Sequence, residues 1–203
     1  MHKKSIKMRK TTVGLTAFSA MLFTFLFSCN NAETKKEAVQ TPISNDSLIK
    51  RGDYLISAIG GCDHCHSPKK MGPDGPEVDM EKRFSGYPAD RPFGKVDSNI
   101  IKNGNVVFSG DLLAFAGPWG VSFAANISSD ETGIGGWTNE QFKKALREGK
   151  LKGMDGSRPL LPPMPWQSFK NMTDDDLNAI FAYLKSTKPI RNIVPSPKQL
   201  NEL

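Results

Sequence analysis

Two cysteines and a histidine within five residues, Cys62-Asp63-His64-Cys65-His66, have the types and spacing that most directly indicate chemistry in this chain. A Cys-x-x-Cys-His sequence is typical of the covalent attachment of c-type haem. Two residues between the thiols put both sulfurs on one side of a helical turn, where each can add to one vinyl group of the porphyrin. The imidazole of His66 can then bind the iron from below the ring. The motif predicts one haem c, held by Cys62, Cys65 and His66.

The second axial position of that iron has few candidate ligands. The sequence has three histidines, but His2 lies in an N-terminal signal and His64 lies inside the attachment turn. A methionine thioether is a soft donor that suits haem iron. Met164 is favoured because it stands in Leu-Pro-Pro-Met-Pro-Trp, where the prolines prevent a helix and stiffen the backbone. Met71 and Met80, shortly after the attachment motif, remain the alternatives.

Two residues near Met164 are candidates for the surroundings of the haem. Trp166 follows the methionine closely and would exclude water from the iron. Arg158 could pair with a haem propionate, because a guanidinium matches a carboxylate in geometry. A solvated surface charge is an equally good interpretation of Arg158. Trp137 is interpreted as a core residue rather than a site residue.

The first 28 residues have the features of an export signal. Five basic residues precede a largely apolar stretch over 13–27, which is too short for a comfortable membrane span. The following Leu-Phe-Ser-Cys29 resembles the lipobox of bacterial lipoproteins. This resemblance implies cleavage before Cys29 and acylation of its sulfur, which would account for the third cysteine. The alternative is an idle thiol behind an ordinary signal peptide.

The basic character of the chain belongs to this signal. The 27 basic and 21 acidic residues give a formal charge of +6, but residues 1–28 hold five of the basic and none of the acidic residues. The remaining chain has 22 basic against 21 acidic residues, so its charge gives no reason to expect a nucleic-acid partner.

Local signals predict three helices in the remaining chain. Residues 29–47 are polar and predict a tether, followed by a helix over 48–59 that ends at Gly60-Gly61. Thr138 and Gln141 form a capping-box pattern that opens a helix over 139–148, with Gly149 as its C-cap. Thr173 opens a last helix that ends near 185. Residues 191–203 are expected to form an extended or frayed tail.

The region 67–125 is rich in glycine and proline and is predicted to be irregular. Its one strand-like piece, 99–108, contains Asn103-Gly104, which favours a tight hairpin turn. Its many aromatic residues predict packing, over the cofactor or elsewhere.

A helix leading into Cys-x-x-Cys-His, a methionine loop and a final helix together resemble a class I c-type cytochrome. Segments 126–137, 141–149 and 161–165 are similar to single-haem domains of bacterial periplasmic dehydrogenase cytochrome subunits and related lipoproteins. The resemblance covers 48–78 and 114–190, with an insertion at 79–113 inside a domain spanning 48–190. It implies an all-α cytochrome c fold with long irregular loops and room for one small β-hairpin. The first and last helices would cross near Gly52/Ile56 and Phe181/Leu184.

The resemblance also implies a function. The chain would be a single-electron carrier with haem iron ligated by His66 and Met164, tethered to a periplasm-facing membrane surface. Its partners would be a donor dehydrogenase and a respiratory acceptor such as a terminal oxidase. It would not itself be an enzyme, although it could be a subunit of a dehydrogenase. The choice between inner and outer membrane stays open.

Two other functions are compatible with the same residues. A haem enzyme or sensor would need Met164 to leave the iron readily. A thiol oxidoreductase would use Cys-Asp-His-Cys with a lowered thiol pKa, but the strand-rich βαβ pattern of such enzymes is absent from the sequence.

Overall fold

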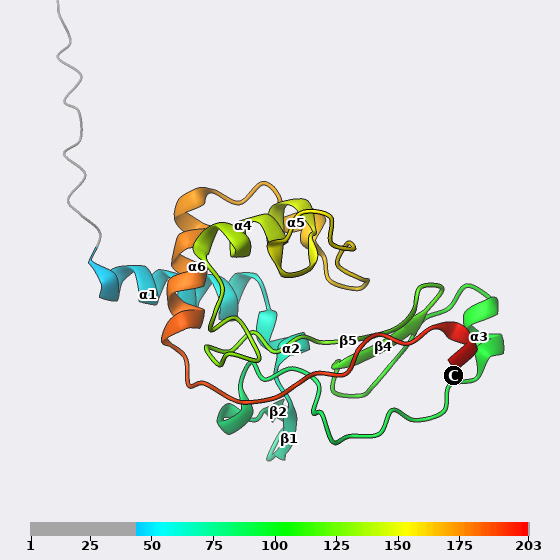
Figure 1. Cartoon of the computed structure of the whole chain (residues 1–203). Helices are drawn as coiled ribbons and strands as arrows, with labels where there is room; N and C mark the ends of the chain where they lie inside the picture. Colours follow the sequence, from blue (N-terminus) through cyan, green and yellow to red (C-terminus); the bar gives the residue numbers. More distant parts are fainter. Residues whose placement is uncertain (1–43, 203) are drawn as a thin grey trace, which may run out of the picture. The chain divides into compact units, whose positions relative to one another are not determined.

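A computed structural model describes residues 44–202 (Figure 1). The predicted signal peptide 1–28, Cys29 and most of the predicted tether 29–47 lie outside the described residues. The helices, the short helical turns (η) and the strands follow in this order: α1 (Asn45–Tyr54), η1 (Leu55–Ile59), α2 (Cys62–His66), β1 (Lys69–Gly72), β2 (Gly75–Val78), η2 (Met80–Lys82), α3 (Ser98–Lys102), β3 (Val107–Phe108), β4 (Ala114–Gly117), β5 (Gly120–Phe123), α4 (Asn139–Glu148), η3 (Leu151–Gly153), α5 (Trp166–Phe169), α6 (Asp174–Ser186) and η4 (Leu200–Glu202).

The first helix starts earlier than the sequence predicted. The Ser44 side chain accepts a hydrogen bond from the backbone N–H of Ser47 and caps α1, so residues 45–47 belong to the helix rather than to a tether. The helix runs on into η1, a π-helical turn, and ends before Gly61, whose φ of 58° is left-handed. The prediction of a helix over 48–59 is confirmed. Among residues 44–202, no helix has the length and apolar character needed to cross a bilayer.

Helices α1 and α6 pack against each other at a glycine (Figure 1). A Cβ atom on Gly52 would lie 2.0 Å from the Ala179 carbonyl oxygen and 2.6 Å from the Tyr183 Cβ. The helix backbones therefore approach more closely at Gly52 than any side chain would allow. The expected crossing at Gly52 is confirmed, and the residues it touches on α6 are Ala179 and Tyr183.

The main core is formed where these two helices meet α4 and two loop residues. Its buried residues come from η1, α4 and α6, with Phe84 and Ile134 supplied by the loops: Leu55, Ile56, Phe84, Ile134, Phe142, Leu177, Ala179, Ile180 and Leu184. Trp137 packs against this cluster, as the sequence predicted. Burial of these side chains is the principal stabilising contribution to the helical part.

The capping signals of the two later helices are confirmed. The Thr138 hydroxyl accepts from the Gln141 N–H and the Gln141 side chain accepts from the Thr138 N–H, so α4 begins with a complete capping box. Gly149 ends α4 in the left-handed conformation, with φ of 64°. The Thr173 side chain caps α6 through the Asp176 N–H.

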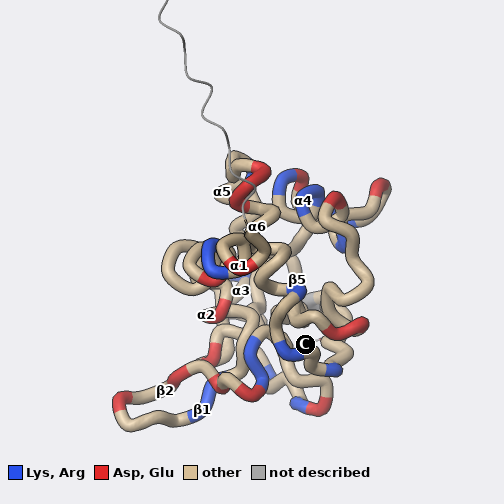
Figure 2. Tube along the Cα trace, turned by 90° about the vertical axis from the view of Figure 1, so that its left-hand side faces the viewer, with Lys and Arg blue, Asp and Glu red and all other residues tan. Residues whose placement is uncertain are grey.

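The prediction of an all-α fold is wrong. Strands β1 and β2 form an antiparallel hairpin that projects from the rest of the described chain (Figure 2), and β3, β4 and β5 form a second antiparallel sheet. These strands have only two to four residues, and β4 is buried along its whole length. Strands of at most four residues are too short for a clear period-2 pattern, so the sequence carried no usable signal for them.

The hairpin predicted over 99–108 is also wrong. Asp97 caps a helical turn, α3, through the Asn99 N–H. Gly104 follows that turn with φ of 83°. The Asn-Gly pair thus ends a helix instead of turning a hairpin, because both structures use the same left-handed glycine. Only Val107 and Phe108 are strand residues, and they pair with β4.

The aromatic residues of the irregular region do pack. Phe84 is fully buried in the main core and holds its loop there with φ of 67°. Tyr87 and Phe93 both contact the Phe123 ring: the Tyr87 ring is tilted against it with centroids 4.7 Å apart, and the Phe93 ring meets it edge to face at 5.6 Å. These residues belong to two smaller clusters. Phe108 is 59% exposed.

The C-terminal segment is extended, and hydrogen bonds hold it along the sheet (Figure 1). The Asn192 side chain donates to the carbonyls of Ser85 and Tyr87 at 2.6 and 2.9 Å. Further along, Lys198 pairs with Val121 of β5 through two backbone hydrogen bonds. The segment therefore connects the loop after β2 with the edge of the larger sheet.

Gly52→Ala should destabilise the protein, because the added methyl would overlap the backbone of α6. Overpacking of this kind costs on the order of 3 kcal/mol in the free energy of unfolding, which denaturant titration of the holo-protein would measure. Gly94→Ala is the matched control, since a Cβ there meets nothing within 4 Å, and should stay within about 0.5 kcal/mol of wild type. Equal losses in both variants would contradict the close approach.

Candidate haem site

The predicted attachment motif forms one helical turn, α2. Gly61 precedes it in the left-handed conformation, and Ser67 ends it. Both thiols, Cys62 and Cys65, are free and half-buried. One turn therefore carries both sulfurs and His66, as the spacing predicted.

The imidazole of His66 is oriented by a backbone carbonyl. Its Nδ1 lies 2.8 Å from the Ala125 oxygen, so Nδ1 carries the hydrogen and donates it. Burial lowers the pKa of His66, although the bond to Ala125 acts in the opposite direction. The ring is thereby held neutral with an unprotonated Nε2, which is the form that binds a metal ion.

The thiols have the opposite electrostatic character to catalytic cysteines. Burial, followed by the charge of Asp63, raises the pKa of Cys62 to about 12. Burial also raises the pKa of Cys65, against the effect of Lys69. Thiol oxidoreductases need a lowered thiol pKa to generate thiolate, so these surroundings disfavour that function.

The thiols of Cys62 and Cys65 and the imidazole of His66 do not form a metal-binding cluster. In the described part of the chain, no three His, Cys, Asp or Glu side chains gather closely enough to hold a metal ion. A structural zinc ion would need such a cluster. Two thiols and an imidazole on one turn that do not form such a cluster fit a porphyrin better, because a porphyrin offers two vinyl groups and an iron.

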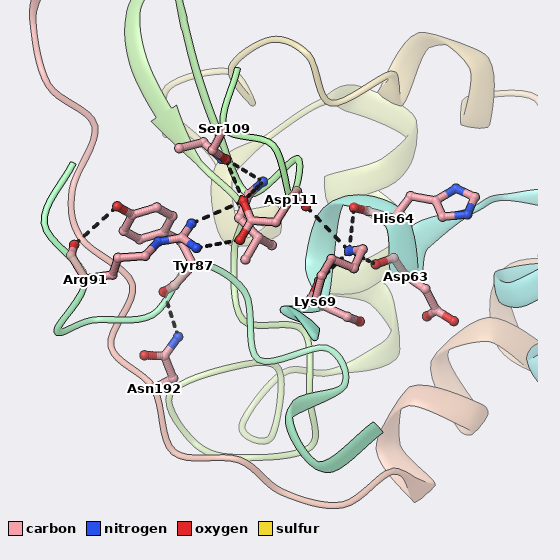
Figure 3. A network of polar contacts seen from close by, with 11 residues as sticks. Asp63, His64, Lys69, Tyr87, Arg91, Ser109, Asp111 and Asn192 are labelled. Atoms are coloured by element: carbon pink, nitrogen blue, oxygen red, sulfur yellow. Dashed lines mark hydrogen bonds and ion pairs between the residues drawn. The ribbon is translucent and has the colours of Figure 1, made fainter. Parts of the chain in front are cut away.

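Lys69 holds the C-terminal end of α2 (Figure 3). Its ammonium donates to the carbonyls of Asp63, His64 and Ser67 at 3.2, 3.0 and 2.6 Å. The carbonyls at a helix end have no partner inside the helix, and a cation there also interacts favourably with the helix dipole. The Asp111 carbonyl oxygen lies farther from the same ammonium, at 3.5 Å. The sequence analysis missed this role, although a lysine just after a short helix is a recognisable signal.

Arg83 ties α2 to the rest of the helical part. Its guanidinium contacts the Asp63 carboxylate at 2.6 Å, with only 17% and 16% of the two side chains exposed. It also donates to the hydroxyls of Tyr183 on α6 and Ser57 on η1, at 2.5 and 2.8 Å. Arg83 lies in the insertion 79–113 that the resemblance did not cover, so the sequence offered no reason to single it out.

Met164 lies in a tight, proline-framed turn. Its N–H donates to the Leu161 carbonyl at 3.2 Å, and its own carbonyl accepts from Trp166 at 3.0 Å. The side chain is half-buried. The other candidates, Met71 and Met80, are 77% and 59% exposed on and near the β1–β2 hairpin. Met164 is therefore the least exposed of the three predicted candidates, and its ligation of the iron stays a prediction.

The remaining predicted residues have ordinary surroundings. Trp166 lies against the backbone of Gly149, where a Cβ would come within 2.4 Å of the indole. Arg158 is exposed and donates to the Pro159 carbonyl, its neighbour in the chain. His64 is exposed on α2 and points away from the Lys69 contacts (Figure 3).

Known proteins with similar sequences support one kind of domain. No family model matches the chain. Over 69% of its length it is 33% identical to the gluconate 2-dehydrogenase cytochrome c subunit of Pantoea cypripedii, covering 23% of that protein. Over 42% it is 40% identical to the fructose dehydrogenase cytochrome subunit of Gluconobacter japonicus, covering 17% of it. These relatives support a cytochrome c domain. The chain spans less than a third of the length of the relatives it matches.

A cytochrome c domain implies covalently bound haem c, one in this domain. The residues present fit that group in their chemistry. Two free thiols share a turn with a neutral imidazole whose Nδ1 is already occupied by Ala125. The thiols would hold the porphyrin, and the Nε2 of His66 would reach its iron.

Arg83→Met should lower the free energy of unfolding by about 3 kcal/mol, because it leaves the Asp63 carboxylate largely buried without its cation. Denaturant titration of the holo-protein would measure this loss. Arg51→Met is the control, since Arg51 pairs with Asp176 but is 52% exposed, and it should cost no more than about 1 kcal/mol. Similar losses in the two variants would show that the Arg83 contacts contribute no more than a surface pair.

Proposed function

We propose that this chain is a single-electron carrier in which His66 and Met164 occupy the two axial positions of one haem c. The observation that carries the proposal is the His66–Ala125 hydrogen bond, which leaves Nε2 free for iron within the turn that presents both thiols. Haem c supplies the interconversion of ferric and ferrous iron by one electron. A six-coordinate iron has no open position for a substrate, which distinguishes a carrier from a haem enzyme.

The surrounding residues keep the imidazole in place. The Ala125 carbonyl fixes the plane of the ring, while Lys69 and Arg83 fix the helical turn that bears it. Contacts of this kind orient a ligand and adjust its basicity. A rigid ligand frame suits a carrier, because the site then changes little between the two oxidation states.

Redox proteins are the proposed partners. The relatives are named as cytochrome subunits of gluconate, fructose and alcohol dehydrogenases, so a dehydrogenase is the proposed donor and a respiratory protein the proposed acceptor. Basic and acidic residues are interspersed along the described chain (Figure 2). Encounters between such carriers and their partners typically bury little surface and are weak.

Export and lipidation at Cys29 are proposed from the sequence. The basic residues, the apolar stretch 13–27 and the Leu-Phe-Ser-Cys29 sequence support them. Acylation with more than one chain would anchor the domain stably to a membrane surface facing the periplasm. The intact mass of the protein from a bacterial host would show the acyl groups, and a mass that retains residues 1–28 would exclude this part of the proposal.

Cys62→Ala combined with Cys65→Ala should abolish covalent haem, because no thiol is left to form a thioether. Haem-dependent peroxidase staining on a denaturing gel would be lost, whereas wild type from a maturation-competent host would stain. His64→Ala is the matched control within the same turn and should stain like wild type. A colourless wild-type protein with both thiols free to alkylate would refute the proposal.

Met164→Ala should lower the midpoint potential, because a thioether ligand stabilises ferrous haem. We expect a decrease of at least about 60 mV, a tenfold change in the one-electron equilibrium, together with carbon monoxide binding to the ferrous protein. Met172→Ala is the control: Met172 packs against the helical core, so its loss should reduce stability and leave the potential unchanged. Redox titration of both variants would measure this, and equal potentials would point to another ligand.

A further inference from the structure

The methionine loop, residues 161–166, has few backbone N–H groups that can donate hydrogen bonds. Pro162, Pro163 and Pro165 have no N–H, so the backbone around Met164 donates only through Met164 itself and Trp166. Both of these bonds stay inside the loop. The loop can therefore be anchored to the rest of the protein only through its carbonyl groups or its side chains.

The larger sheet supplies such an anchor. The Ser122 hydroxyl, on β5, donates to the Pro162 carbonyl oxygen at 2.6 Å, across 40 residues of sequence. In the described part of the chain, Ser122 is the only hydrogen-bond donor to that oxygen. Ser122 is 7% exposed, so water has little access to its hydroxyl.

The hydroxyl is itself held in position. The Trp119 indole N–H donates to the Ser122 oxygen at 3.2 Å, and the Phe115 carbonyl lies 3.5 Å away. A hydroxyl has one hydrogen, and the short distance assigns it to Pro162. Two hydrogen bonds therefore follow one another: the Trp119 indole donates to the Ser122 hydroxyl, and this hydroxyl donates to the Pro162 carbonyl.

The sheet that carries Ser122 is fixed at its edge. Val121, the preceding residue, pairs with Lys198 of the C-terminal segment through two backbone bonds of 2.8 and 3.1 Å. Ser122 itself pairs with Phe115 across β4 and β5. The donor to the methionine loop therefore belongs to a part of the structure with little freedom to move.

We propose that Ser122 is a positioning residue for the second axial ligand, holding the loop so that Met164 stays on the iron. This inference rests on the proposed ligation by Met164. The sheet β3-β4-β5, which the sequence analysis did not predict, thereby acquires a role at the proposed redox site. Through this bond the methionine loop is held by a strand of the sheet and not by a helix.

Imidazole binding to the ferric holo-protein tests this role, because imidazole competes with the methionine for the iron. Ser122→Ala should lower the imidazole dissociation constant about fivefold, in keeping with the loss of one buried hydrogen bond. Ser128→Ala is the matched control: Ser128 is a fully buried serine whose hydroxyl bonds to Asn126 and the Ile190 carbonyl. It should reduce stability and leave imidazole affinity within about twofold of wild type.

A double variant separates this inference from the proposed ligation. In the Met164→Ala background, Ser122→Ala should have no further effect on imidazole affinity, because the residue acts through Met164. If Ser122→Ala shifts the affinity no more than Ser128→Ala, or shifts it equally without Met164, the inference is wrong while the ligation stands. If Met164→Ala alone leaves wild-type imidazole affinity unchanged, the ligation and the inference both fail.

Discussion

The close approach of α1 and α6 at Gly52 is the constraint on which the rest of this structure depends. With no side chain at this position, the two backbones touch at Ala179 and Tyr183, and the core residues of η1 and α6 can interdigitate. Because only Gly60 and Gly61 separate η1 from α2, the position of the crossing constrains where the two thiols and His66 lie. A five-residue helix has little stability of its own, so α2 takes its position from this packing and from polar contacts.

Those polar contacts come from the irregular part of the chain. Lys69 binds carbonyls at the C-terminal end of α2, Arg83 neutralises Asp63, and the Ala125 carbonyl orients His66. Loss of the Arg83 or the Ala125 contact would leave a group on α2 without this partner, at a cost of about 1–3 kcal/mol or more. The long glycine- and proline-rich region thus forms the polar surroundings of the attachment turn, while the helices form its apolar support.

The two axial sides are organised differently. The proposed imidazole side is held by contacts to one short helix, whereas the proposed methionine side is a proline-framed loop whose carbonyl accepts a hydrogen bond from a strand residue. Raised thiol pKa values and a neutral imidazole favour an attachment site over a thiol catalyst. The relatives, cytochrome subunits of dehydrogenases, lead to the same kind of domain from sequence alone.

The sequence by itself determined the features that depend on neighbouring residues. The Cys-x-x-Cys-His turn, the caps of α4 and α6 and the apolar stripes of the helices are local signals, and they were readable without any tertiary information. The two sheets, the bonds of Arg83, the Ala125 acceptor and the Ser122 anchor were decided only by the tertiary structure, whereas the Lys69 bonds to the end of α2 are local. Short buried strands have no periodic pattern, and a backbone carbonyl is the same in every residue type. Such partners can be found only when the fold brings together residues that lie 20 to 59 positions apart in the chain.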